Sequence, residues 1–517
     1  MTGSTRGQIM VFQIYYINHG GPMKRTLALL LLLGPASGFA ASNPDIKGRD
    51  ISGSSYNRHA RIMVDRYTSW AAALAACPAA GCILDATSPK VPRAMGTFDV
   101  GAEQIKVEFG PGTFTADHIV LRAGLWLQGS GASNTGTVIQ SIGANSRPVM
   151  TIPGVNNVQV FNFKVDGIRF LGAAGNTSQD GLLSDVSSCT NCNLNYGIFS
   201  NLWFLGFAGS ALHLKGGTVD ARAANQFLLF QNVNAFRPSG INPVLKIEGY
   251  AGQIHFDTCE FDGASDNDGG DNIYLGNGAN GGTNFMGPNT IFFDNLTSQG
   301  GSVDIHVDGG TTDIDIRGLH SEGTPGILLV SNSSIATPSG TSNPLIHLHD
   351  SLISATSTTN SGAGYVVNVT DPSIGGGARV VLENNIIGGA PDNVVKTANT
   401  NGAIVICRNN FYILSPAGAA PTVNVTPAQS PAATLDVRSW NHVVLTSSAT
   451  NITTLRGSHL PGETVTFIVV GGTVQFATGG NLSLGSNPSP LIVHSGDSVT
   501  FTRLDIGNPW QLTAHSW

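Results

Sequence analysis

The stretch 227–413 repeats one short sequence pattern, and this repeat constrains the fold more than any other feature of the sequence. Each copy alternates apolar and polar residues with a period of two, the period of a β-strand, and ends in a small polar turn. The clearest copies are 228–232, 254–258, 291–295, 314–318, 346–350, 380–384 and 405–409. A second strand follows each turn, so the repeating unit is a strand, a turn and another strand.

The spacing of the copies predicts a solenoid. Successive separations of 26, 37, 23, 32, 34 and 25 residues result if the equivalent residues are Phe230, Phe256, Phe293, Ile316, Leu348, Leu382 and Cys407. A unit that buries one face and accepts loop insertions is typical of an all-β, right-handed, single-stranded parallel β-helix. In such a stack the shared turn residues would form a ladder of hydrogen-bonded amides, made by Asn232, Asn295, Asn384 and Asn409.

Composition agrees with a large, turn-rich β protein. Of 517 residues, 41% are hydrophobic and only 11% are charged, with 65 glycines and 25 prolines, whereas a disordered chain would be more charged and less apolar. The net charge is −7 and no run of Lys or Arg occurs. The sequence therefore predicts no nucleic-acid partner.

The N-terminal segment 1–40 reads as an extension and a signal peptide. Met23, Lys24 and Arg25 precede an apolar run at 27–33, and a small-x-small cleavage site ends at Ala40. The run is too short to span a bilayer, so no integral membrane segment is expected after cleavage. We expect secretion, to the periplasm or the extracellular space; the alternative is a buried N-terminal helix.

The cysteines fit an exported protein. Cys77 and Cys82 flank a tight loop, and Cys189 and Cys192 flank two residues, so both pairs are predicted to be local disulfides. The second pair could alternatively be half of a metal site or a redox motif. Two further cysteines lie inside the repeats and are expected to fill the core, Cys259 and Cys407.

Three N-terminal motifs carry a resemblance to a known family. An alanine-rich helix is predicted at 68–76, where it would cap the open end of the solenoid, and the motifs 111–114 (Pro-Gly-Thr-Phe) and 127–131 (Leu-Gln-Gly-Ser-Gly) follow it. Together they resemble the pectate lyase superfamily, the pectin-lyase-like β-helix proteins with rhamnogalacturonase-like, epimerase-like and phage-tailspike-like members. The resemblance covers 68–414 and implies a polysaccharide partner.

The chain also departs from that family. The segment Asp65-Arg66-Tyr67 is a poor substitute for the acidic segment that often precedes the helix, and the Asn-Thr-Asp, Asp-Asp and Arg-Ile-Lys motifs of polygalacturonases are missing. Pectin hydrolysis by their mechanism is therefore not expected. We place the β-helix domain at 41–415.

The C-terminal part differs in composition. An Ala-, Pro-, Thr- and Ser-rich linker is predicted at 416–431, and closely spaced strands with Gly and Asn turns indicate a small β-rich module at 432–517. Such a module, with Trp510 near its end, resembles those that close tailspike-like chains. Its predicted role is to cap the core, to bind a ligand or to form a homotrimer.

Candidate site residues lie on a third strand in each turn, at 212–215, 245–248, 272–275 and 304–308. Alternation points the polar residues outward, and turns about 4.8 Å apart would stack them. One predicted column consists of His213, Lys246, Tyr274 and His306. The next consists of Lys215, Glu248 and Asp308. The plain alternative is a solvated polar face.

The first column contains the groups that lyase chemistry on a uronate requires. Lys246 would neutralise the substrate carboxylate, and Tyr274 would abstract the C5 proton. His306 would protonate the leaving oxygen, because exposed Asp304 and Asp308 on its own strand would favour the imidazolium. Hydrolysis would instead need two carboxylates, with candidates Glu248, Asp304, Asp308 and Glu322. Expected substrate-binding residues are His213, Lys215, Glu248 and His320.

The sequence contains two other sets of polar residues that could have a function. The acidic insertion 262–271 could hold Ca²⁺ through Asp266, Asp268 and Asp271, although a solvated acidic loop is the alternative. A second outward column is expected to form stacked ion pairs and contains Asp257, Asp294, Arg317, His349, Glu383 and Arg408.

The sequence thus favours an exported carbohydrate-active enzyme, a polysaccharide lyase acting on an acidic, uronate-containing glycan. A non-catalytic, adhesin-like or tailspike-like glycan-binding protein is the first alternative. A glycoside hydrolase on the same fold is the second.

Overall fold

The computed structural model describes residues 60–101, 104–144, 147–218, 221–238, 240–276, 287–309, 311–331, 344–355, 364–370, 378–389, 393–397, 404–408, 410–412, 434–438, 442–445, 451–457, 464–469, 472–504 and 510–516. The predicted signal peptide and linker lie outside these residues. Within them, no helix is both long enough and apolar enough to span a membrane.

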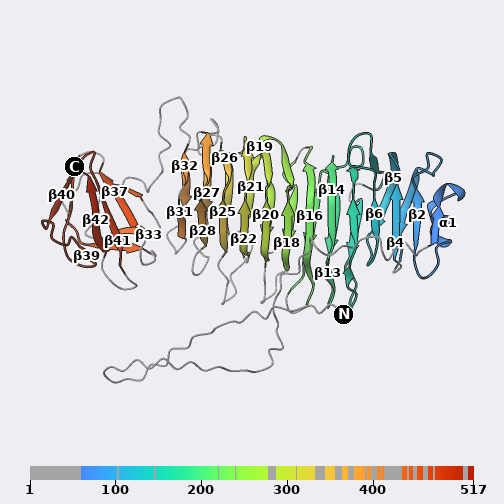
Figure 1. Ribbon diagram of the computed structural model, residues 1–517, viewed down its shortest axis with the longest axis horizontal. Helices are drawn as coiled ribbons and strands as arrows, with labels where there is room; N and C mark the ends of the chain where they lie inside the picture. The colour runs from blue at the N-terminus through green and yellow to red at the C-terminus, as the bar shows by residue number, and fades with distance from the viewer. Residues whose placement is uncertain are drawn as a thin grey trace, which may run out of the picture. The chain divides into compact units, whose positions relative to one another are not determined.

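The described part before residue 413 is a parallel β-helix, as predicted. Its 32 strands belong to one hydrogen-bonded system, and the strands of successive coils pair in parallel (Figure 1). Each coil contributes to three faces, which we name sheets I, II and III in chain order. Every residue in a strand therefore has a neighbour on the next coil rather than on the same one.

Sheet I begins each coil. It comprises residues 198–200 of β14 (Ile198–Leu205), residues 228–231 of β16 (Ala224–Phe236), β1 (Ala60–Met63), β2 (Cys82–Ala86), β4 (Ile105–Phe109), β6 (Trp126–Gln128), β10 (Lys164–Asp166), β18 (Ala251–Asp257), β20 (Pro288–Asp294), β22 (Thr312–Arg317), β25 (Leu345–His349), β28 (Arg379–Glu383) and β31 (Ile404–Arg408). Two short strands precede this sheet: β13 (Asn193–Asn195) pairs with the start of β16, and β9 (Val160–Phe161) pairs with β13.

Sheet II follows a sharp turn. It comprises the last parts of β14 and β16, the first parts of β3 (Ala94–Asp99), β5 (Gly112–Val120), β19 (Glu260–Gly276) and β21 (Thr297–Val307), and the strands β7 (Thr137–Ser141), β11 (Ile168–Leu171), β23 (His320–Glu322), β26 (Leu352–Ala355), β29 (Ile386–Gly389) and β32 (Phe411–Tyr412).

Sheet III completes the coil. It comprises the last parts of β3, β5, β19 and β21, and the strands β8 (Met150–Pro153), β12 (Leu182–Asp185), β15 (Leu212–Lys215), β17 (Leu245–Glu248), β24 (Gly326–Val330), β27 (Tyr365–Val369) and β30 (Asn393–Thr397).

The strand register confirms all seven predicted equivalent positions. Phe230, Phe256, Phe293, Ile316, Leu348, Leu382 and Cys407 are opposite one another on successive coils of sheet I. The aromatic members stack inside the coil, with ring centroids 4.8 Å apart for Phe230 and Phe256 and 4.9 Å apart for Phe256 and Phe293. Alternation thus directs one unbroken apolar line into the core.

The predicted amide ladder is found only in part. The amide of Asn232 donates to Asn201 Oδ1 at 2.9 Å, but neighbouring corners hold other residue types, such as Thr258 and Gly318, and Asn409 lies outside the described residues. What the corner positions share is a left-handed backbone, with a positive φ at Asn201, Asn232, Thr258, Asn295, Gly318, Asp350 and Asn384. The turn therefore selects residues that tolerate this conformation.

A longer ladder forms one residue further on, inside the coil. Asn385 is fully buried, and its Oδ1 accepts from the backbone N–H of Ser351 at 3.1 Å. The amide of Asn385 donates to Leu348 O and to Asn410 Oδ1, at 2.9 and 3.0 Å. These side chains satisfy backbone groups that the corner would otherwise leave buried without partners.

The N-terminal end confirms the predicted cap. Helix α1 (Trp70–Ala75) begins after Ser69, whose Oγ accepts from the N–H of Ala72 at 3.2 Å. Trp70 is buried and packs its ring 5.7 Å from Phe98 and 5.6 Å from Phe109. The 3₁₀ turn η3 (Val64–Arg66) precedes the helix. This end of the apolar core is therefore covered by α1.

The cysteine predictions hold for the described side chains. Cys77 pairs with Cys82 and Cys189 pairs with Cys192, with Cα atoms 5.5 and 6.1 Å apart. Cys259 is a free, buried thiol, and burial raises its pKa to about 12. It is therefore an inert part of the core.

The C-terminal residues form a small β module with its own core, as predicted. Its five-stranded sheet contains β34 (His442–Leu445), β37 (Thr464–Val469), β41 (Ser498–Arg503), β42 (Trp510–Ser516) and β39 (Leu482–Ser483). Smaller sheets contain β35 (Asn451–Ile452), β38 (Thr473–Phe476), β40 (Leu491–His494), β33 (Thr434–Arg438) and β36 (Thr454–Gly457). Trp510 is 2% exposed within this core.

Candidate functional site

The predicted outward column on sheet III is present. His213 on β15 is opposite Lys246 on β17, Lys246 is opposite Tyr274 on β19, and Tyr274 is opposite His306 on β21. All four side chains are partly exposed, and their inward neighbours, such as Leu212 and Ile305, are buried. The alternation predicted from sequence therefore places these groups on one face.

The first half of the column is an ion-pair cluster around His213. Its Nε2 is 2.8 Å from Glu248 Oε2 and its Nδ1 is 3.2 Å from Asp180 Oδ2. Although burial opposes the charged form, hydrogen bonds to Asp180 and Glu248 raise the pKa of His213. Burial likewise opposes ionisation of Glu248, but its hydrogen bond with His213 and the charge of Lys246 lower its pKa to about 2.

Lys246 completes this cluster and connects it to Tyr274. Its Nζ lies 2.9 Å from Glu248 Oε1 and 5.9 Å from the centre of the Tyr274 ring. The ammonium is thus paired with a carboxylate and also lies near the aromatic ring. A substrate carboxylate at this position would share the cation with Glu248.

The second half of the column is a hydrogen-bonded chain that we name the His306 network. It runs in the order Asp271, His306, Ser331, Asp308 and Tyr274. His306 Nδ1 lies 2.7 Å from Asp271 Oδ2, and its Nε2 lies 2.7 Å from Ser331 Oγ. Ser331 Oγ donates to Asp308 Oδ1 at 2.9 Å, and Tyr274 Oη donates to Asp308 Oδ2 at 2.9 Å. A titratable ring and a phenol thus share one connected set of carboxylates.

Tyr274 occupies its position because residue 276 is a glycine. A Cβ at Gly276 would lie 2.5 Å from Tyr274 Oη and 2.7 Å from its Cζ, so the ring lies directly over this residue. Burial, reinforced by the charge of Asp308, raises the pKa of Tyr274 well above its usual range. The phenol therefore stays protonated at neutral pH, which does not suit its predicted role as the base.

Two predicted site residues are not exposed. Asp304 has no exposed surface, and its carboxylate accepts from Ser298 Oγ at 2.6 Å, from Thr324 Oγ1 at 2.8 Å and from Ser321 Oγ. Asp308 is 1% exposed and accepts from Tyr274 and Ser331 instead of facing solvent. The prediction that both carboxylates are exposed is wrong for two reasons. Asp304 is buried because the alternation is interrupted where β21 turns from sheet II into sheet III, and Asp308 is buried because Tyr274 and Ser331 cover it.

The burial of Asp304 changes its ionisation. Removal from water raises the pKa of Asp304 to about 7, against the opposing effect of its hydrogen bonds. The interruption is visible in the register, where β19 and β21 slip between Asp262 and Asp266 and again between Asp266 and Asp271. Asp304 is therefore an interior polar anchor for this corner.

Three other candidates lie apart from the column. His320 and Glu322 are on β23, in sheet II, where they contact each other at 2.9 Å and remain exposed. Lys215 lies one position further along β15 and pairs with Asp185 at 3.3 Å. With Glu322 on another face and Asp304 and Asp308 buried, the structure does not bring together the exposed carboxylate pair that hydrolysis needs.

The acidic segment 262–271 is not the predicted loop, since it continues strand β19 with bulges. Asp268 pairs with the buried Arg237, Oδ1 lying 2.6 Å from Nη2, and Asp271 contacts His306. The side chain of Asp266 lies outside the described ones. Asp268 and Asp271 thus have protein partners, and Ca²⁺ binding by this segment stays a prediction.

The sequence did not reveal three residues that contact the outward histidines: Asp180, Asp271 and Ser331. Asp180 and Ser331 are not among the candidates from sequence, and Asp271 was predicted only as a metal ligand. Asp180 and Asp271 lie 33 and 35 residues before the histidines that they contact, and Ser331 lies 25 residues after His306. Each separation is about one coil, so a search for carboxylates and hydroxyls one coil away from each outward histidine would have found them.

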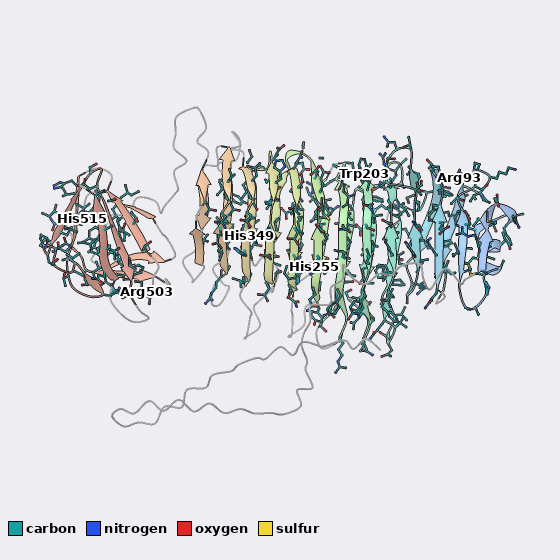
Figure 2. The ribbon with its side chains drawn as sticks, viewed as in Figure 1. Arg93, Trp203, His255, His349, Arg503 and His515 are labelled. Carbon is teal, nitrogen blue, oxygen red and sulfur yellow. A yellow bond between two sulfur atoms is a disulfide. The ribbon has the colours of Figure 1, made fainter. Side chains whose placement is uncertain are left out.

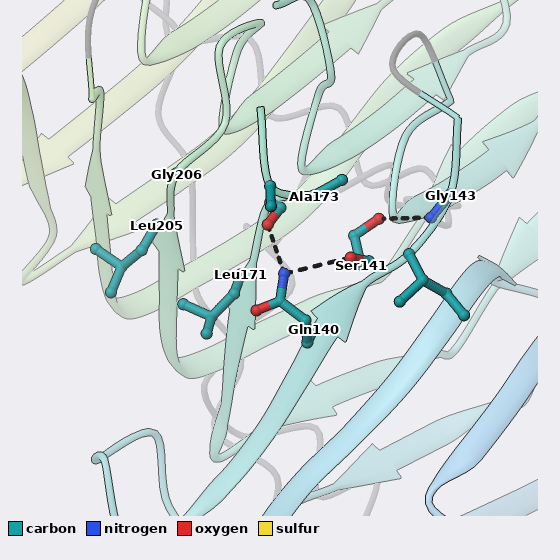
Figure 3. Close-up of a pocket in the computed structure, with 10 residues that line it drawn as sticks. Gln140, Ser141, Gly143, Leu171, Ala173, Leu205 and Gly206 are labelled. Atoms are coloured by element: carbon teal, nitrogen blue, oxygen red, sulfur yellow. Dashed lines mark hydrogen bonds between the residues drawn. The ribbon is translucent and has the colours of Figure 1, made fainter. Parts of the chain in front are cut away.

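A cavity of about 650 Å³ lies elsewhere, over the ends of β7, β11 and β14 (Figure 3). Gln140 crosses it and donates to Gly172 O at 2.6 Å. Its ten lining residues include Ser141 and Ile142 but no ionisable side chain. The cavity therefore offers no group for acid–base chemistry, unlike the outward column on sheet III.

No family model matches the sequence, and no curated protein matches it. Solved structures of pectin-lyase-like β-helix proteins do match at the level of fold. PfbA, a surface adhesin of Streptococcus pneumoniae, is 12% identical, with 79% of this chain and 92% of that chain covered and a TM-score of 0.39. A mutant tailspike of E. coli bacteriophage HK620, in complex with a hexasaccharide, is 12% identical, with 71% and 68% covered and a TM-score of 0.40.

A third match is the A-module of a mannuronan C-5 epimerase from Azotobacter vinelandii, 11% identical, with 60% of this chain and 87% of that chain covered and a TM-score of 0.31. These likenesses concern the fold alone. The assignment of the parallel β-helix rests on the strand register described above.

Proposed function

We propose that the protein is an exported polysaccharide lyase that acts on a uronate-containing glycan at the His306 network. One observation carries this proposal: His306 and Tyr274 are neighbours in the outward column, with ring centroids 5.2 Å apart at an interplanar angle of 90°. Each ring has a carboxylate behind it, Asp271 for the imidazole and Asp308 for the phenol. A base and a proton donor on adjacent coils are the pair that β-elimination requires.

The geometry favours roles opposite to those expected from sequence. Asp271 accepts from His306 Nδ1–H, which leaves the Nε2 lone pair to take a proton. In this tautomer the single proton of Ser331 Oγ points to Nε2, and it turns back to Asp308 when the substrate reaches the ring. Because Tyr274 keeps its phenol protonated, it suits the donor. In the proposed reaction, His306 takes the proton from C5, the C4–O bond breaks as the C4–C5 double bond forms, and Tyr274 protonates the leaving oxygen.

The remaining column would hold the substrate. Lys246 lies next to Tyr274 and offers a cation for the uronate carboxylate, which lowers the cost of removing the C5 proton. His213 and Glu248 fix the position of this ammonium through the contacts described above. Export and homotrimer formation stay predictions from the sequence.

The test is the ultraviolet absorbance of unsaturated sugar ends across a panel of uronate polymers. On a polymer that the parent cleaves, His306→Ala and Tyr274→Phe should each reduce turnover by about 10²-fold or more, because each removes one proton transfer. His255→Ala, a partly exposed histidine on sheet I, is the matched control and should keep parental turnover. Parental turnover by His306→Ala would overturn the site.

A second outcome distinguishes the non-catalytic alternative. If no polymer is cleaved, but one is retained on a column of the immobilised parent and not on a column of Lys246→Ala, the face binds glycan without acting on it. Retention would then support the glycan-binding protein that the sequence also allows.

The order of contacts around His306 favours a second candidate reaction. Asp271 on Nδ1 and Ser331 on Nε2 reproduce the sequence of groups in a Ser-His-Asp triad, which would hydrolyse an ester such as an O-acyl group on a glycan. Ser331 is 8% exposed and its hydroxyl also contacts Asp308. Ser331→Ala should abolish ester hydrolysis, while Tyr274→Phe should spare it, which separates this reaction from elimination.

A further inference from the structure

A second histidine cluster lies on sheet I, away from the proposed site. His347 and His349 alternate with the buried Leu348, so both project outward from β25. Their rings stack with centroids 4.1 Å apart at 18°. Asp315 on β22 lies opposite His347 in the neighbouring coil. Three side chains from two adjacent strands therefore meet at one point of the outer surface.

The ring nitrogens converge on a single carboxylate oxygen. Asp315 Oδ1 is 3.4 Å from His347 Nδ1 and 3.2 Å from His349 Nε2, and the three potential ligand atoms lie within 4.8 Å of one another. Ligands bound at about 2.0–2.1 Å in a tetrahedral zinc site lie about 3.3 Å apart, which follows from the bond length and the tetrahedral angle. The cluster already has this spacing around Asp315 Oδ1.

The other nitrogen of each ring faces a further carboxylate. His347 Nε2 lies 3.3 Å from Glu383 Oε2, and His349 Nδ1 lies 3.0 Å from Asp350 Oδ2. Histidines that bind metals usually donate their second ring N–H to a carboxylate, which fixes the tautomer and orients the ring. Glu383 and Asp350 are in position to do this.

Charge also favours a cation here. A neutral imidazole carries one proton, so neither ring can donate to both of its carboxylates unless it becomes charged. Asp315, Asp350 and Glu383 together bring three negative charges, and Arg317, with Nε 3.8 Å from Asp350, brings one positive charge. A divalent ion would supply the remaining charge and replace the missing protons.

We propose that Asp315, His347 and His349 bind one divalent transition-metal ion of the Zn²⁺ class. His347 Nδ1, His349 Nε2 and Asp315 Oδ1 are the ligands, and Glu383 and Asp350 orient the two rings. Two imidazoles with one carboxylate suit zinc and its neighbours better than Ca²⁺ or Mg²⁺, which prefer oxygen ligands only. Three protein ligands leave a fourth position for water or for an atom of a bound molecule.

This site is independent of the proposed lyase site. Among the described residues these three form the one group of at least three His, Cys, Asp or Glu side chains whose ligand atoms converge in this way. They belong to sheet I, whereas the His306 network belongs to sheet III. Figure 2 labels His349 and also His255, an outward histidine on β18, three coils earlier. The ring of His255 stacks on Phe292 rather than on a second histidine.

Isothermal titration of the full chain with ZnCl₂, after removal of bound metals with a chelator, tests the proposal. The parent should bind one ion that Asp315→Asn, His347→Ala and His349→Ala each weaken at least tenfold. His255→Ala, the matched control, should bind as the parent does. CaCl₂ should give no binding that depends on these three residues.

Three results would overturn the proposal. They are no zinc binding by the parent, zinc binding unchanged in a His347→Ala/His349→Ala double variant, and Ca²⁺ binding that Asp315→Asn removes while zinc binding persists. Should a histidine variant fail to fold, the nearly isosteric Asp315→Asn still decides the outcome. A zinc-dependent rise in the melting midpoint that is lost in Asp315→Asn is an independent readout.

Discussion

The outer faces of sheets I and III are built by the same coils and the same alternation, yet they present histidine differently. On sheet III, His306 has a carboxylate on one nitrogen and the Ser331 hydroxyl on the other. On sheet I, His347 and His349 point one nitrogen each at the same carboxylate oxygen. A hydroxyl can give or take a proton, whereas a shared carboxylate favours a cation between the rings.

The difference arises from where the partners lie in each coil. Asp271 lies within β19, where this strand enters sheet III, and Ser331 directly follows β24. Asp315, His347 and Glu383 lie within strands of sheet I and contact one another directly across coils. The contacts on sheet III thus form a chain of hydrogen bonds, whereas those on sheet I form a compact cluster. Four predictions test how separate the two faces are.

The largest expected effect concerns the buried ion pair that supports sheet III. Arg237 and Asp268 have side chains 1% and 8% exposed, and Arg237 also donates to Asp271 O at 2.8 Å. Arg237→Ala should lower the free energy of unfolding by about 3–5 kcal/mol, because it leaves the buried carboxylate of Asp268 without its partner. Urea titration provides the measurement. Arg317→Ala on sheet I, 62% exposed, should cost about 0–1 kcal/mol.

The next effect is the pH dependence contributed by Asp304. Its folded pKa of about 7 lies above the unfolded value of about 3.9, so the folded state binds more protons between these limits. The stabilisation is complete below about pH 4 and is lost as pH rises toward 7, at up to about 1.4 kcal/mol per pH unit. Asp304→Asn should flatten the stability curve over this range.

Asp257→Asn, on the outer face of sheet I, is the control for this pH profile and should keep the parental slope. If the slope between pH 4 and 7 is the same in Asp304→Asn as in the parent, another buried group is responsible. Asp262 is the first candidate, since burial and the charge of Glu260 raise its pKa to about 8.

A smaller effect is expected where Tyr274 lies over Gly276. Gly276→Ala places a methyl group 2.5 Å from Tyr274 Oη, so it should cost about 1–3 kcal/mol and displace the ring. In a Tyr274→Ala background the same substitution should cost much less, which a double-mutant cycle measures. Additive costs would mean that the clash is relieved by a shift of the backbone, and that the ring does not depend on the glycine.

The smallest effect concerns the corner of sheet I. Asn295 has a φ of 55°, so Asn295→Ala should cost about 1–2 kcal/mol through the left-handed backbone alone. Asn295→Gly should be close to neutral, because glycine adopts this conformation freely. A thermal melt of the three proteins compares them. Equal costs for both variants would show that the side-chain amide, rather than the backbone, matters at this corner.

The two faces were not equally predictable from sequence. On sheet I, the inward positions from Phe230 to Leu382 follow from alternation, because each strand is short and regular. On sheet III the outward column was also found, but the burial of Asp304 and Asp308 was not. The break in alternation that buries Asp304 at the corner, and the cover that Tyr274 and Ser331 provide for Asp308, leave no mark in the local pattern.

The contacts of the site were beyond sequence reasoning for a related reason. Glu322 was a candidate for the carboxylate pair of a hydrolase, but a three-residue strand does not reveal in sequence which sheet it joins. His349 was assigned to a column of ion pairs. The register of that column holds, but its Arg317 pairs with Asp350 rather than with Asp294. Side-chain reach across coils decides these partners, and it depends on insertions of variable length.

The left-handed corner has an evolutionary consequence. The fold of a coil requires inward apolar residues and a corner residue that tolerates a positive φ, such as Asn232 or Asn295. It places few constraints on the outward residues. Selection can then change one outer face without disturbing the other, since neither determines the core. A lineage could lose the acid–base groups of sheet III and retain the histidine cluster of sheet I, or the reverse, and still inherit the same scaffold.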